Sequence, residues 1–90
     1  MANKREIKKD ISHIIGSVVE EAYNVQLNDK TKAEASEDII IEAVALYDAL
    51  LERVSGYKTS EKGKRKMYFN NIKHDLFVKA SDLFVKVEKL

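Results

Sequence analysis

Apolar side chains recur at intervals of three and four residues in three long segments of the chain. The first segment runs from about residue 4 to residue 25. Its apolar positions fall within an arc of about 140° at about 100° per residue, which predicts an amphipathic helix with one buried face. These positions are Ile7, Ile11, Ile14, Ile15, Val18, Val19, Ala22 and Val25.

The second segment, from about residue 32 to residue 55, has the same period. Its main stripe is Ile39, Ala43, Leu46, Leu50 and Val54. Asn3 with Glu6 and Thr31 with Glu34 have the spacing of capping boxes, which predicts that helices begin just after Asn3 and Thr31. Gly56 follows the last apolar position and is expected to end the second helix.

The third segment, from about residue 66 to residue 89, contains a seven-residue repeat. Residues 75–80 (DLFVKA) are followed by residues 82–87 (DLFVKV), and five of the six positions are identical. Seven residues make two helical turns, so the repeat predicts a helix packed along a seam. It also places Asp75 before Lys79 and Asp82 before Lys86 at the favourable spacing of four.

Three helices of similar length with short connections predict an all-α, antiparallel, up-down-up three-helix bundle. We expect residues 1–90 to form a single domain that assembles through further helix–helix contacts, because a chain of 90 residues has a thin core. The side chains expected to lead the core are Ile11, Ile14, Val18, Ile39, Ala43, Leu46, Leu50, Phe69, Ile72, Leu76, Leu83 and Phe84.

Composition excludes several classes of site. The chain has no cysteine, which excludes disulfides, thiolate metal sites and a cysteine nucleophile. It has no proline, which suits long helices. It has no apolar run of about 18 residues to span a membrane, and residues 1–6 lack the apolar region of a secretory signal. We therefore expect a cytoplasmic protein.

The charge is unevenly placed, although the net charge is only +1. Residues 31–55 carry 2 basic and 6 acidic side chains, whereas residues 56–90 carry 9 basic and 4 acidic. An acidic helix beside a basic one explains this, and we favour that interpretation because steering fields need a charge excess. The alternative is nucleic-acid binding by segment 58–73, near Tyr57, Tyr68 and Phe69, through the polyanion-binding candidates Lys58, Lys62, Lys64, Arg65 and Lys66.

Catalytic and metal-binding patterns are incomplete. Asp10 precedes His13 by three residues, but the other histidine, His74, has Asn71 at that spacing, so a two-histidine carboxylate metal site is not formed. Ser12 and His13 are adjacent and point about 100° apart on a helix, which prevents their hydrogen bond. We expect no catalytic residue, metal or cofactor, and a small enzyme or metal protein is the weakest hypothesis.

Apolar positions are left over on the backs of the second and third helices. Small residues there allow another helix to approach closely, and burial in a dimer or under another helical protein explains two such strips. The sequence therefore predicts a non-enzymatic protein-interaction module, most simply a homodimer. Its predicted interface consists of Ile41, Ala45, Ala49, Met67, Val78 and Val85.

Overall fold

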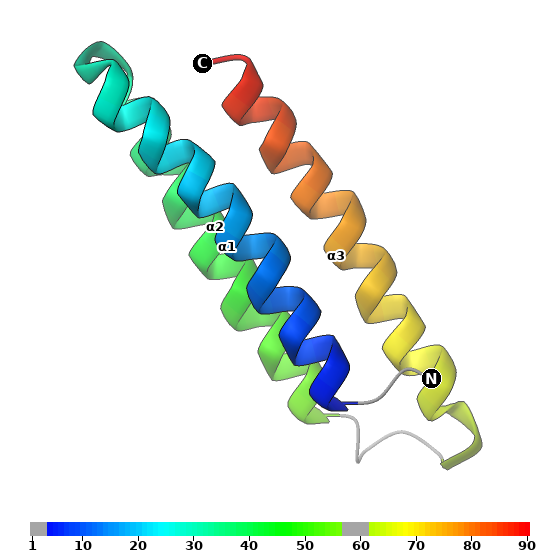
Figure 1. Cartoon of the computed structure of the whole chain (residues 1–90). Helices are drawn as coiled ribbons and strands as arrows, with labels where there is room; N and C mark the ends of the chain where they lie inside the picture. Colours follow the sequence, from blue (N-terminus) through cyan, green and yellow to red (C-terminus); the bar gives the residue numbers. More distant parts are fainter. Residues whose placement is uncertain (1–3, 57–61) are drawn as a thin grey trace.

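The computed structural model describes residues 4–56 and 62–90 and contains three long helices. These are α1 (Lys4–Asn28), α2 (Ala33–Ser55) and α3 (Arg65–Glu88). Short 3-10 helices, η1 (Lys30–Lys32) and η3 (Lys62–Lys64), precede α2 and α3. The helices run alternately up, down and up, and every pair is in contact, so the predicted all-α three-helix bundle is confirmed (Figure 1).

The bundle is long and thin. It measures 50 × 17 × 16 Å, and its radius of gyration is 14.8 Å, compared with about 12 Å for a compact domain of this length. Its accessible surface is 6210 Å², whereas a folded monomer of 10.3 kDa exposes about 5,400 Å². The elongated shape therefore leaves a large share of the chain at the surface.

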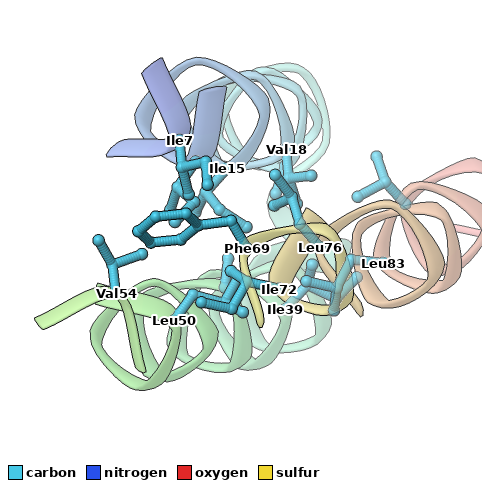
Figure 2. Packing of buried hydrophobic residues seen from close by; sticks show 14 residues of the cluster. Ile7, Ile15, Val18, Ile39, Leu50, Val54, Phe69, Ile72, Leu76 and Leu83 are labelled. Atoms are coloured by element: carbon cyan, nitrogen blue, oxygen red, sulfur yellow. The ribbon is translucent and has the colours of Figure 1, made fainter. Parts of the chain in front are cut away.

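Side chains from all three helices fill one continuous interior. Figure 2 shows Phe69 of α3 between the side chains of α1 and α2, with Ile72 and Leu76 following it along the bundle. Ile72 and Leu76 are fully buried. Nine of the twelve side chains expected to lead the core are buried: Ile11, Val18, Ile39, Ala43, Leu50, Phe69, Ile72, Leu76 and Leu83.

Three expected core residues are only half-buried. Ile14, Leu46 and Phe84 lie against the core, each at the edge of its helix's buried face. They were expected to lead the core, but the two neighbouring helices cover a narrower face than the apolar positions of each helix span, so these three side chains stay partly accessible at its edge. Ile7 and Val54, in contrast, are fully buried at the end of the bundle where α1 begins and α2 ends.

The turn between α1 and α2 differs from the predicted capping box. Asp29, rather than Thr31, caps this turn: its Oδ1 accepts the Thr31 amide at 3.0 Å and the Thr31 hydroxyl at 2.5 Å. These two hydrogen bonds hold the pKa of Asp29 below its ordinary value. The hydroxyl is thus a donor to Asp29 and not the cap of α2, which begins at Ala33 without a side-chain cap. The other predicted box begins at Asn3, outside the described residues.

Ion pairs tie α3 to the other two helices, which contact each other more extensively than either contacts α3. Arg53 of α2 pairs with Asp75 at 2.6 Å, and Glu42 of α2 pairs with Lys86 at 2.8 Å. Asp10 of α1 lies 3.8 Å from Lys73. Glu42–Lys86 joins an acidic residue of α2 to a basic residue of α3, as the charge distribution predicts, whereas Arg53–Asp75 joins the same helices with the charges reversed.

Gly56 ends α2 as predicted, but not through a left-handed conformation. Its φ is −80°, and its amide donates to carbonyls of the last turn, including that of Arg53. A Cβ on Gly56 would lie 3.2 Å from the Tyr68 hydroxyl oxygen, which donates to the same Arg53 carbonyl. A larger residue here would require the Tyr68 hydroxyl, which joins the end of α2 to the start of α3, to shift by a few tenths of an ångström.

Candidate functional site

The outward side of α3 carries an unusual amount of exposed apolar surface. Met67 is 64% exposed, Phe77 56%, Val78 48% and Val85 42%. We call these four residues the α3 outer face. Helical periodicity places them about 100–180° from Leu76, on the side of α3 that points away from the core. Large side chains gathered on one helix face are typical of surfaces that bind another protein.

The α3 outer face continues into a shallow groove between α3 and α1. The groove has a volume of about 400 Å³. Ile14 of α1 forms one wall, and Phe77, Phe84 and Val85 of α3 form most of the other. Ile14 and Phe84 are half-buried there. They were expected in the core but instead line this groove, because each lies at the edge of its helix's buried face. The groove widens the apolar surface beyond a single helix.

Phe77 is the residue of this surface that the sequence prediction missed. Phe77 and Phe84 occupy the same position of the seven-residue repeat, one residue after the buried Leu76 and Leu83. A step of one residue rotates about 100° around a helix, so both phenylalanines turn away from the seam. This shared position was the signal that could have identified them.

The predicted strip on α2 is also exposed. Ile41 is 58% exposed, and Ala45 and Ala49 are exposed as well. We call these three residues the α2 strip. Its only large side chain is Ile41, and nearby Val44 faces a separate groove between α1 and α2. The α2 strip therefore offers much less apolar area than the α3 outer face.

Charged side chains separate the two apolar surfaces. Positions 79, 82 and 86 follow Val78 around α3 in the direction of α2, where they lie beside Glu42 of that helix. We call this group the charged belt: Glu42, Arg53, Asp75, Lys79, Asp82 and Lys86. The Arg53 guanidinium donates a hydrogen bond to Asp75, and this holds the pKa of the Asp75 carboxyl below its ordinary value. The α2 strip and the α3 outer face consequently do not form one continuous apolar surface.

The basic segment is only partly described. Lys58 lies outside the described residues, and Lys62 belongs to η3. Lys64 and Lys66 are exposed at the start of α3, and Arg65 is half-buried. Of the aromatic residues beside them, Tyr57 lies outside the described residues, Phe69 is buried, and the Tyr68 hydroxyl donates to the Arg53 carbonyl. These two rings are therefore not free to stack on bases.

The candidate catalytic and metal-binding groups lie at the surface. His13, Ser12 and His74 are all exposed, and the Ser12 hydroxyl lies 3.5 Å from the Tyr47 hydroxyl. In residues 4–56 and 62–90, no three histidine, aspartate or glutamate side chains are grouped closely enough to hold a metal ion. Over the same residues, no helix is both long and apolar enough to cross a membrane.

Comparison of the chain with protein-family models, curated proteins and solved structures finds no match.

Proposed function

We propose that this protein is a non-enzymatic helical interaction module that self-associates through the α3 outer face. The observation that carries this proposal is the exposure of Met67, Phe77, Val78 and Val85 on one side of one helix. Scattered apolar residues are normal on protein surfaces, but Phe77, Val78 and Val85 lie within three turns of one helix face and adjoin an apolar groove, whereas Met67 lies farther along α3, beyond His74 and Asn71.

The shape of the bundle supports the same function. A thin bundle buries little of its surface, and small domains often add an oligomer interface to reach adequate stability. A standard interface takes about 800 Å² from each partner, or about one eighth of the 6210 Å² that this chain exposes. A two-fold homodimer is the simplest solution, because it buries the same patch on both chains.

The α3 outer face is favoured over the α2 strip because it carries more large side chains. It is favoured over nucleic-acid binding because Tyr68 and Phe69 are engaged within the bundle. The absence of cysteine is compatible with the reducing cytoplasm that we expect as its location.

The test is the effect of introduced charge on the oligomeric state. We expect wild-type protein to sediment as a dimer in analytical ultracentrifugation. Val78→Glu with Val85→Glu should shift it to monomer, because burying unpaired carboxylates at the interface is costly. Glutamate is a good helix former, so the far-ultraviolet circular dichroism spectrum should keep its helical shape.

Two matched variants serve as controls. Ile41→Glu with Ala45→Glu adds the same charge to the α2 strip, and we expect it to leave the dimer intact. Lys64→Glu with Arg65→Glu changes the basic segment and should also leave it intact. A wild-type monomer at all concentrations contradicts self-association. Retention of the wild type on immobilised DNA or RNA at low salt, lost in the Lys64 and Arg65 variant, would support nucleic-acid binding instead.

A further inference from the structure

The exposed side of α3 has a spacing that is symmetric about one residue. Its central part consists of the exposed Phe77, Val78, Ser81 and Val85 and the half-buried Phe84, and we call these five residues the pairing stripe. His74 and Glu88, both exposed, lie at its two ends. Counted from residue 74 to residue 88, the steps are three, one, three, three, one and three, so the pattern reads the same in both directions from Ser81.

We propose that a second copy of this chain docks on the pairing stripe with its own α3 antiparallel, and that the two-fold axis passes beside Ser81. This inference rests on the proposed self-association and specifies its geometry for Phe77, Val78 and Val85, whereas Met67 lies outside the pairing stripe. In this arrangement Phe77 of one copy meets Val85 of the other, and Val78 meets Phe84. Each large ring is therefore opposed by a smaller β-branched side chain, which is the alternation that lets facing layers interdigitate.

Charge complementarity selects the antiparallel direction. Antiparallel pairing brings His74 of one copy to Glu88 of the other at both ends of the stripe, where the imidazole can donate to the carboxylate. Parallel pairing about the same residue instead sets Glu88 against Glu88, and like charges that face each other repel. The charged side chains between positions 74 and 88 all belong to the charged belt on the side of α3 that faces α2, and not to the stripe.

Ser81 is suited to the point of closest approach. It is exposed and small, and both helices can therefore come close together there without displacing a large side chain. It also lines the groove between α1 and α3 together with Phe77, Phe84 and Val85. Because α1 and α3 run in the same direction, an antiparallel helix from the second copy runs opposite to both of its new neighbours, as α2 does within the bundle (Figure 1).

Single cysteines test this geometry cleanly, since the natural chain has none. Ser81→Cys places two sulfur atoms at the proposed axis, where helix backbones can approach to the Cα separation of about 4.4–6.8 Å that a disulfide requires. Under mild oxidation we expect this variant to form a covalent dimer about tenfold or more faster than Ser12→Cys, an exposed serine on α1. Ala45→Cys reports in the same way on the α2 strip.

A mixed pair of variants tests the direction. Residues 74 and 88 are separated by about 21 Å along α3 at about 1.5 Å per residue. In the antiparallel dimer, His74→Cys alone should cross-link poorly, and Glu88→Cys alone likewise. A mixture of the two should give a heterodimer, detected by mass spectrometry. In a parallel dimer each variant cross-links with itself.

The outcomes separate this inference from the proposed function. A wild-type monomer in ultracentrifugation contradicts self-association and this geometry together. A dimer in which Ser81→Cys cross-links no faster than Ser12→Cys overturns the geometry alone, as does rapid cross-linking of Ala45→Cys. Self-cross-linking of His74→Cys overturns the antiparallel direction. Rapid cross-linking of Ser81→Cys together with the mixed heterodimer supports the proposal.

Discussion

Individual side chains link the helices through interactions that helical periodicity does not encode. The repeat predicts that Asp75 pairs with Lys79 within α3, whereas the structure gives Asp75 a 2.6 Å contact with Arg53 of α2. Both partners are visible in the sequence, and so is the position of each on its helix. Their pairing depends on how far α3 is shifted along α2, which spacing within one helix cannot determine. Lys86, which holds the position of Lys79 in the second copy of the repeat, likewise pairs with a residue of α2, Glu42.

The Arg53–Asp75 pair predicts a pH-dependent contribution to stability. The pKa of Asp75 is lowered in the folded state, chiefly by the hydrogen bond from Arg53, so folding favours the ionised carboxylate. The stabilisation should be complete at pH values above the ordinary value of 3.8 and lost as the pH falls through the lower folded pKa. Asp75→Asn should therefore unfold at lower urea than the wild type at pH 7, and the difference should shrink toward pH 2.

Asp82→Asn is the matched control for this experiment, because Asp82 holds the equivalent position of the repeat. The lowered pKa of Asp29 also makes stability pH-dependent, but it is present in all three proteins and cancels from their differences. A gap between wild type and Asp75→Asn that stays constant from pH 7 to pH 2 contradicts the assignment.

At the level of elements, the sequence predicts the helices better than their ends. The apolar period identifies α1, α2 and α3 because burial of one face dominates the energy of a long amphipathic helix. Their ends depend on single hydrogen bonds that compete with one another. Thr31 satisfies the capping pattern, yet its hydroxyl donates to Asp29, two residues earlier, and α1 extends to Asn28, three residues beyond the predicted end.

The junction between α2 and α3 gives a prediction at this scale. Tyr68→Phe removes the hydroxyl that donates to the Arg53 carbonyl and keeps the ring beside Phe69. We expect a loss of about 1 kcal/mol in the free energy of unfolding, the usual contribution of one hydrogen bond. Tyr47→Phe is the control, because its hydroxyl makes only a long, exposed 3.5 Å contact with Ser12. Urea unfolding compares the two, and equal losses would count against a role for the junction.

For the whole molecule, the same repeat serves two surfaces. The sequence alone predicted the buried one, because Leu76 and Leu83 continue the seam that packs against α1 and α2. The exposed one could be predicted only in part, since Val78 and Val85 were identified whereas Phe84 was assigned to the core. A seven-residue repeat gives each residue its position around the helix, but it does not say which of those positions are buried. The width of the face that the two neighbouring helices cover follows only from the assembled bundle.

Leu76 and Phe77, which are adjacent in the repeat, should respond differently to truncation. Leu76 is fully buried, so Leu76→Ala should cost about 2–5 kcal/mol at any protein concentration, through lost burial and a cavity. Phe77 is 56% exposed in the single chain, and Phe77→Ala should change the stability of a dilute, monomeric sample by only about 0.5 kcal/mol or less.

Leu76→Ala and Phe77→Ala should also differ in how their melting temperatures depend on protein concentration. Association that buries Phe77 stabilises the folded state by mass action, so the melting temperature of the wild type should rise with concentration. Leu76→Ala leaves the outer surface of α3 unchanged and should keep that rise from a lower starting point. Phe77→Ala should flatten it. Differential scanning calorimetry over a hundredfold range of concentration measures all three slopes, and a flat wild-type curve would show that the exposed surface of α3 does not pair with itself.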